Sequence, residues 1–177
     1  MPVLFTPRLE LVPITLPFVE AVMLDRRADV ERMAGAVLPR NWPGRTLIER
    51  AFSASLDDIR ADPDKRLWGD RLMITREGER RLVGSVIFHG RPDATNDGVT
   101  DVGYGVEDSM QGQGYATEGT RAQVDWALSQ PGVKKICATT PPWHTASIRV
   151  LEKSGFHRVG LEEHPFLGEI LCFARER

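Results

Sequence analysis

The chain has 177 residues, of which 41% are hydrophobic and 27% are charged, and its net charge at pH 7 is −2. These values are ordinary for a globular protein of one domain, and the balanced charge argues against a nucleic-acid partner. No apolar run approaches the roughly 20 residues that span a bilayer, and the N-terminus lacks the pattern of a signal peptide. We therefore expect a cytoplasmic protein with neither nucleic acid nor a membrane as partner.

Cysteine and histidine usage argues against a metal site. The four histidines are scattered and no C-x-x-C motif occurs, so the spacing typical of metal ligands is missing. Cys137 and Cys172 lie in apolar runs and are predicted to fill the core, as free cysteines usually do. The sequence thus predicts no metal cofactor.

The first elements are predicted to be a strand and two helices. Residues 8–12 alternate apolar and polar side chains, which favours a strand. Residues 17–33 are predicted to form one helix with a proline near its first turn, and residues 39–44 a loop rich in Pro and Gly. Thr46 and Glu49 resemble a capping box at the start of the second helix, whose apolar face is formed by Ile48, Phe52, Leu56 and Ile59.

The middle of the chain changes to the period of β-strands. Asp62-Pro63 is predicted to end the second helix. Residues 67–75 and 82–89 are predicted to form two strands joined around Gly78, which is a hairpin signal. A polar loop follows at residues 92–98.

The remaining elements predict a β–α–β unit and a final pair of strands. A strand at 101–107, a helix at 115–129 and a strand at 135–140 would form a parallel pair with a crossover helix. The last predicted elements are a helix at 145–153, a left-handed Gly155 and strands at 156–160 and 167–174. One α+β domain with a mixed sheet follows from this order.

The segment that precedes the helix at 115–129 is a candidate anion site. It reads Gln111-Gly112-Gln113-Gly114-Tyr115-Ala116. The first turn of a helix carries backbone N–H groups without internal partners and a partial positive charge, so phosphate can bind there without Lys or Arg. Gly112 and Gly114 keep side chains away from these amides. The alternative is an ordinary strand-to-helix turn; the P-loop and dinucleotide-binding patterns do not fit.

Three blocks resemble a known family. Residues 101–107 followed by 111–118 resemble motif A of the GNAT acetyltransferase superfamily, whose core pattern Q/R-x-x-G-x-G/A is matched by Gln111, Gly114 and Ala116. Residues 145–156 resemble motif B of the same superfamily. Residues 6–11 resemble the opening strand of its RimJ/RimL-like branch, whose members acetylate protein N-termini and various small amines.

The resemblance implies both a fold and a cosubstrate. The implied fold is α+β, with a central mixed and mostly antiparallel sheet of about seven strands, flanked by helices and containing a splayed parallel pair. Residues 1–177 would form a single GNAT acetyltransferase domain. Acetyl-CoA would be the cosubstrate, with no metal.

The resemblance also assigns the cofactor contacts. The amides of Gln111 to Ala116 would hold the pyrophosphate, and the strand near Val106 would carry a bulge and pair with the pantetheine arm. A backbone N–H near Val106 would polarise the thioester carbonyl. Met110 either lines the pantetheine channel or fills a gap in the core. The expected cofactor-binding residues are Val106, Met110, Gln111, Gly112, Gln113, Gly114, Tyr115, Ala116, Thr117, His144 and Ser147.

Two positions depart from the family pattern. His144 stands where motif B usually has Asn; it could contact the cofactor, act as a general acid or base, or lie in a solvated loop. Leu151 stands where some relatives have the Tyr that reprotonates the CoA thiolate. Ser147 is the substitute acid that we expect, its alternative role being to cap the helix.

A carboxylate or a water chain must accept the proton of the attacking amine, because amines with a pKa near that of Lys are mostly protonated at pH 7. Asp101 lies where several relatives place the catalytic Glu. Glu107 has the same strand parity, unless a bulge reverses it. The candidate catalytic residues are therefore Asp101, Ser147 and Glu107, although either carboxylate could be a surface charge.

The acceptor pocket is expected to involve the first two helices and the loops at 39–44 and 92–98. Its candidate walls, each of which could instead belong to the core, are Trp42, Trp68, Phe88, Trp143 and Phe166. The predicted function is acetyl-CoA-dependent N-acetylation of a primary amine of a protein N-terminus or small molecule, with transfer of a longer acyl group left open. A non-catalytic acyl-CoA-binding module is the alternative. A homodimer is possible.

Overall fold

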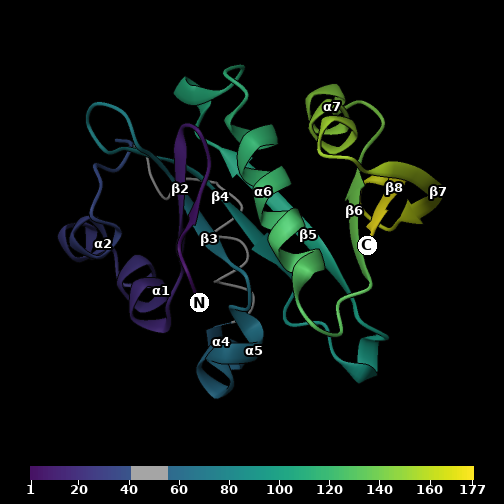
Figure 1. Ribbon diagram of the computed structural model, residues 1–177, viewed down its shortest axis with the longest axis horizontal. Coiled ribbons are helices and arrows are strands. Elements are labelled where there is room, and N and C mark those ends of the chain that lie inside the picture. Colours follow the sequence, from purple (N-terminus) through teal and green to yellow (C-terminus); the bar gives the residue numbers. More distant parts are fainter. Residues whose placement is uncertain (41–55) are drawn as a thin grey trace.

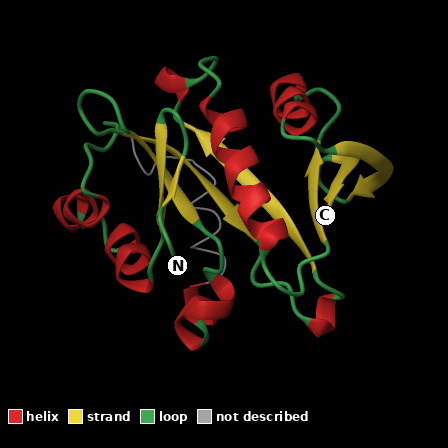
Figure 2. Ribbon diagram, in the orientation of Figure 1, coloured by secondary structure: helices red, strands yellow, loops and turns green. Residues whose placement is uncertain are grey.

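The computed structural model describes residues 1–40 and 56–177 (Figures 1 and 2). The strands are β1 (Leu4–Phe5), β2 (Leu9–Pro13), β3 (Arg71–Thr75), β4 (Leu82–Phe88), β5 (Val99–Val106), β6 (Lys135–Thr140), β7 (His157–His164) and β8 (Gly168–Glu176). The helices are α1 (Leu16–Met23), α2 (Arg27–Ala34), α4 (Leu56–Ala61), α5 (Pro63–Arg66), α6 (Tyr115–Ser129) and α7 (Thr145–Lys153). Short 3₁₀ helices at Ala94–Asn96 and Asp108–Met110 flank β5.

The described strands form one eight-stranded sheet in the order β1-β2-β3-β4-β5-β6-β8-β7. All neighbours are antiparallel except β5 and β6, which are parallel and are joined by the crossover helix α6 (Figure 1). The predicted α+β fold with a mixed, mostly antiparallel sheet is confirmed. The strand beyond the expected seven is β1, which has two residues and is too short to show an alternating pattern.

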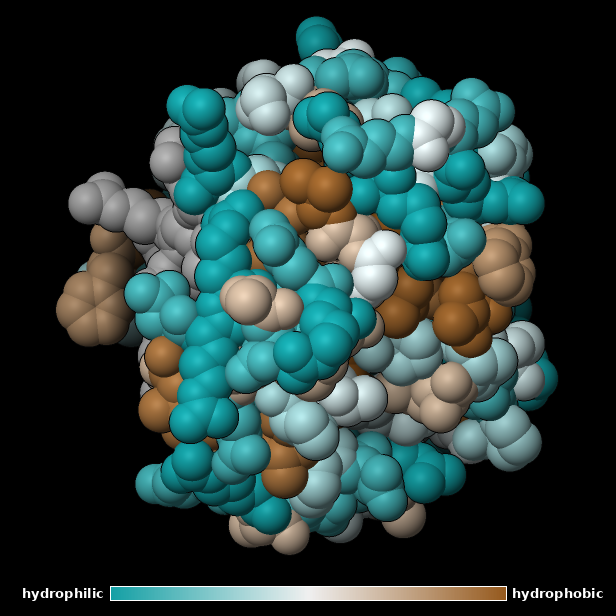
Figure 3. All heavy atoms as spheres, turned by 90° about the vertical axis from the view of Figure 1, so that its left-hand side faces the viewer, coloured by the Kyte–Doolittle hydropathy of each residue, from teal (hydrophilic) through white to brown (hydrophobic). Residues whose placement is uncertain are grey.

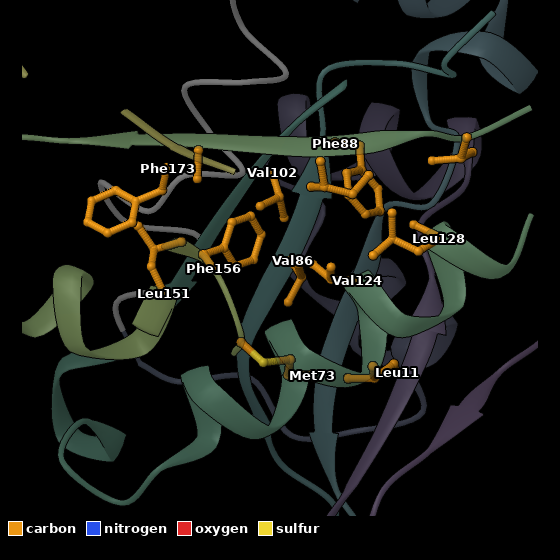
Figure 4. Packing of buried hydrophobic residues seen from close by; sticks show 14 of the residues in the cluster. Leu11, Met73, Val86, Phe88, Val102, Val124, Leu128, Leu151, Phe156 and Phe173 are labelled. Atoms are coloured by element: carbon orange, nitrogen blue, oxygen red, sulfur yellow. The ribbon is translucent and has the colours of Figure 1, made fainter. Parts of the chain in front are cut away.

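Helices cover both faces of the sheet. Figure 4 shows the core on the face of α6 and α7, where Val124 of α6 and Leu151 of α7 pack with strand residues such as Val86. On the other face, Phe18 of α1 and Val30 of α2 belong to a second hydrophobic cluster that includes β3 and β4 residues. All five residues of β3 are buried, as expected for a strand covered on both sides. From the side of α1 and α2 the surface is mainly hydrophilic (Figure 3).

The predicted helix at 17–33 is two helices. Asp25 has φ 53°, in the left-handed region, and separates α1 from α2. The Arg26 amide turns back to donate to Ala21 O at 2.9 Å. The break is not visible in the sequence because each short helix buries its own apolar face, so the helical periodicity is present on both sides of Asp25.

Of the predictions around residues 46–75, some fall outside the described residues and two need correction. The capping box at Thr46 and the apolar positions Ile48 and Phe52 lie outside the described residues. Asp62-Pro63 begins α5 rather than only ending a helix, since Asp62 Oδ1 accepts from Lys65 N at 3.0 Å and proline suits the first helical position. The strand predicted from residue 67 therefore begins only at Arg71.

None of the helices among residues 1–40 and 56–177 combines the length and apolar character that crossing a bilayer requires.

Close packing of α6 on the sheet depends on Gly119. A Cβ at this position would overlap Met73 Sδ, and Met73 is fully buried. We expect Gly119→Ala to lower the free energy of unfolding by about 1–2 kcal/mol, because overpacking a closed core costs more than the roughly 1 kcal/mol that alanine gains over glycine within a helix. Urea unfolding measures this.

Gly160→Ala is the matched control for this prediction. Its added Cβ would lie 3.9 Å from Cys172 Cβ, an ordinary contact, so a change below about 0.5 kcal/mol is expected. Equal stability of the two variants would contradict the packing argument.

Candidate active site

Strands β5 and β6 separate partway along their length. Their parallel pairing ends at Asp101 opposite Cys137. Beyond this point β5 continues to Val106 paired with β4, and β6 continues to Thr140 paired with β8. Figure 1 shows the two strands diverging towards α7 and the start of α6. The facing edges of residues 102–106 and 138–140, here called the β5–β6 separation, thus offer backbone groups to an extended ligand.

The separation forms without the predicted bulge. β4 and β5 keep one register from Phe88 opposite Val102 to Gly84 opposite Val106. Strand alternation is therefore unbroken to the end of β5. Tyr104 and Val106 pack against the core beneath α6 and α7, and Asp101 has the opposite parity.

The loop before α6 presents a row of free backbone amides. Those of residues 112–117 donate no hydrogen bond to any described residue; the first bonded amide of the helix is that of Glu118, which donates to Gly114 O at 3.0 Å. Gly112 and Gly114 have φ values of 74° and 86°, which glycine adopts at little cost. No atom lies within 4 Å of a Cβ built on Gly112. The amides, the open space and the helix dipole together fit a pyrophosphate.

Gln111 shapes the end of β5. Its Nε2 donates to Val106 O and to Asp108 Oδ1, each at 3.0 Å, and its backbone amide donates to Asp108 O at 3.3 Å. The Gln111 amide is therefore engaged, and the free amides begin one residue later than the sequence indicated. Met110 is half-buried and packs against the core.

The first turn of α6 is tied to the N-terminal segment by Glu118. Its carboxylate accepts from Thr6 Oγ1 at 2.6 Å, from the Arg8 amide at 2.8 Å and from Arg8 Nε at 2.7 Å. Arg8 Nη1 also donates to Gln113 O at 2.9 Å. Burial by itself would raise the pKa of Glu118, but the hydrogen bonds from Thr6 and Arg8 outweigh it and lower that pKa. Sequence reasoning missed this contact, although both partners lie in the recognised blocks.

We expect Glu118→Gln to lower the free energy of unfolding at pH 7 by about 1–3 kcal/mol, because it removes charge-assisted hydrogen bonds from a mostly buried site. A lowered folded-state pKa means that the ionised form contributes stability above the ordinary value of 4.5 and loses it as the pH falls through the folded value. Urea unfolding at neutral and acid pH measures the difference between wild type and variant. A difference that did not shrink in acid would contradict the ionic role.

Ser147 contacts Tyr104 rather than capping α7. The N-cap of α7 is His144, and no side-chain hydrogen bond caps this end. Ser147 Oγ lies 2.9 Å from Tyr104 Oη, which also lies 3.0 Å from Ser147 O. Tyr104 was missed in the sequence; its position between two glycines and on the core-facing parity of β5 was the available signal.

His144 is exposed, and its ring lies 5.7 Å from that of Trp143. Its backbone amide donates to Pro141 O at 3.0 Å. The structure therefore places His144 at the start of α7, on the side of the separation formed by β6.

Glu107 is a buried carboxyl group directly after β5. Its side chain is 9% exposed, and Oε1 has no hydrogen-bond partner among the described residues. Burial, and secondly the charge of Asp108, raise the pKa of Glu107. A raised pKa makes this carboxylate a stronger base than an ordinary glutamate, which suits a group that accepts a proton during catalysis.

Asp101 lies where β5 and β6 are still paired. It lies five positions before Val106, which corresponds to about 17 Å along a strand. The structure therefore brings Ser147 close to β5 through Tyr104, and sets Glu107 beside Val106, while Asp101 lies towards the closed end of the separation.

Most of the expected acceptor walls lie elsewhere. Trp68 and Phe88 are buried, with ring centroids 5.3 Å apart, and belong to the core. Trp143 and Phe166 are 72% and 91% exposed, and Trp42 lies outside the described residues. The loop at 92–98 precedes β5 and so lies at the end opposite the free amides; it lines a hollow of about 730 Å³ there.

A second hollow, of about 540 Å³, adjoins the free amides along α6. Gly114 contributes to it, and its charged residues are of both signs, with Arg121 and Lys153 beside Glu118 and Asp125. Among the described residues, no group of three or more His, Cys, Asp or Glu side chains could hold a metal ion.

This geometry, with free amides at a helix start beside a separated parallel strand pair, fits a ligand that combines phosphate groups with an extended arm. A family model described as an acetyltransferase (GNAT) domain matches residues 8–157, and the chain belongs to this family. The predicted family and the predicted N-acetyltransferase class are thereby confirmed.

Known proteins support the same assignment. The chain is 26% identical over 156 residues to the uncharacterized N-acetyltransferase YjdG of Bacillus subtilis (strain 168), covering 88% of this chain and 90% of that protein. A ribosomal-protein-S5-alanine acetyltransferase from Vibrio fischeri shares the fold with a TM-score of 0.68 and 15% identity, covering 99% and 97% of the two chains. Mycobacterium smegmatis RimJ in complex with CoA-disulfide also shares the fold, with a TM-score of 0.62 and 21% identity, covering 95% of this chain and 81% of that chain.

Proposed function

We propose that this chain, as a single domain over residues 1–177, transfers the acetyl group of acetyl-CoA to a primary amine by direct attack. The row of free amides at residues 112–117 carries the proposal, because it provides donors for a pyrophosphate at the start of a 15-residue helix. Acetyl-CoA supplies the activated acetyl thioester when bound.

Individual residues have separate roles in proton transfer, in stabilising the leaving group and in orienting the cosubstrate. Glu107 accepts the proton of the amine, since its carboxyl group is buried and its pKa is raised. Ser147 donates a hydrogen bond to the leaving sulfur. The Val106 backbone, at the free edge of β5, orients the pantetheine arm, and Met110 and His144 flank this region.

A protein N-terminus is the acceptor that we favour over a small-molecule amine. An α-amino group has an ordinary pKa of about 7.7–8.0 and is partly neutral at pH 7, whereas a Lys side chain, at about 10.4, is not. The Vibrio fischeri protein of the same fold is named for a ribosomal protein. We further expect a cytoplasmic protein, with a homodimer possible.

Purified protein mixed with acetyl-CoA and a panel of peptides and small amines tests this function. Thiol release and mass spectrometry of the acceptor are the measurements, and peptides with blocked α-amino groups are the control. Acetylated α-amines are expected. Acetyl-CoA binding without transfer to any amine would instead support the acyl-CoA-binding module.

A further inference from the structure

Tyr104 and Ser147 join the two sides of the β5–β6 separation. Tyr104 belongs to β5, and Ser147 lies in the first turn of α7, which follows β6. Their hydroxyl oxygens are 2.9 Å apart, and either one could be the donor. The direction of this hydrogen bond decides where the hydrogen of Ser147 points.

The hydrogen-bonding capacity of the two groups favours Tyr104 as the donor. Tyr104 has one hydrogen, with Ser147 O at 3.0 Å and Ser147 Oγ at 2.9 Å as possible acceptors. A carbonyl within a helix already accepts from the amide four residues later, so the hydroxyl oxygen has more free capacity. When Tyr104 donates to Oγ, the serine hydrogen must point away from Tyr104 and is free to meet a ligand.

The surroundings keep Tyr104 protonated and in place. Its ring is half-buried against the core beneath α6 and α7. Burial is the main cause that raises the pKa of Tyr104 to about 12. The tyrosine therefore remains a donor over the whole range in which the protein is expected to work.

We infer that Tyr104 is a positioning residue, which donates to Ser147 Oγ and so directs the serine hydrogen to the thiol end of coenzyme A. The inference rests on the proposed function and adds the residue that orients Ser147. Tyr104 itself need not touch the reacting atoms.

The acidity of the thiol of bound coenzyme A reports this arrangement without any acceptor amine. A donor directed at the sulfur stabilises the thiolate and lowers the pKa of the thiol. We expect Ser147→Ala to raise that pKa by about one pH unit, and Tyr104→Phe to raise it by most of the same amount. The double variant is expected to match Ser147→Ala. Ultraviolet absorbance of the thiolate during a pH titration measures all four proteins.

Two further variants make the test specific. Ser147→Thr keeps a hydroxyl group and is expected to retain the wild-type thiol pKa. Ser129→Ala removes an exposed hydroxyl at the C-terminal end of α6, away from the free amides, and is expected to change nothing. Thermal unfolding confirms that each variant is folded, and Tyr104→Phe keeps the ring that packs in the core.

Steady-state kinetics provide the second readout. Tyr104→Phe is expected to lower kcat about tenfold, with the KM for acetyl-CoA changed less than about twofold, and to have no further effect in the Ser147→Ala background. A normal thiol pKa in Tyr104→Phe beside a raised one in Ser147→Ala, or additive losses in the double variant, would overturn the inference and leave the proposed function standing. Failure of the wild type to bind coenzyme A would overturn both.

Discussion

Replacing Glu107 by glutamine is expected to lower kcat by about 10²- to 10⁴-fold, the usual contribution of a general base, without changing the affinity for acetyl-CoA. Glutamine has nearly the same shape but cannot take the proton of the amine. Burial of the side chain and the neighbouring Asp108 raise the pKa of Glu107 above its ordinary value of 4.5. Steady-state kinetics with a peptide acceptor, together with calorimetric titration of acetyl-CoA, measure the two quantities.

The pH dependence of kcat provides a second test of Glu107 as the base. A base acts only when deprotonated, so the rate of the wild type is expected to rise with pH through the folded pKa of Glu107. Asp108→Asn removes a nearby negative charge that raises this pKa, so the acid limb is expected to move to lower pH. If Asp101→Asn abolished turnover while Glu107→Gln left it intact, Asp101 would be the base instead.

Gly112→Asp is expected to weaken acetyl-CoA binding about tenfold or more relative to Gly112→Asn. Both side chains tolerate the left-handed backbone of this position, where φ is 74°, and the built Cβ meets open space. The variants therefore differ mainly in charge. A carboxylate beside bound phosphates costs about 1–3 kcal/mol at short range in partly solvated surroundings. Calorimetric titration measures the two dissociation constants.

A ligand without phosphates separates the charge effect from damage to the loop. Acetyl-pantetheine lacks the pyrophosphate, so Gly112→Asp and Gly112→Asn are expected to bind it equally. The difference between the variants should also narrow at high salt, because exposed charges are screened. Equal acetyl-CoA affinities at low salt would show that the phosphates bind elsewhere.

Features that depend on residues close together in the chain were predictable from the sequence. The helix at 115–129 and the helix at 145–153 have the predicted bounds, since their periodic patterns and stop signals lie within each segment. The prediction of one helix at 17–33 was wrong because a single left-handed residue, Asp25, divides this segment into two helices. The prediction of a bulge was wrong for a related reason. A bulge is a change of register between two strands, so the sequence of one strand does not reveal it.

The sequence alone predicted the segment that we propose for phosphate binding, because its amides, its glycines and its helix start are consecutive in the chain at residues 111–118. Only the tertiary structure decided how that site is supported and what chemistry surrounds it. The Arg8 amide reaches Glu118 across 110 residues, and Tyr104 reaches Ser147 across 43. The pKa of Glu107 likewise depends on burial by distant elements, and burial cannot be inferred from the residues on either side of a carboxylate.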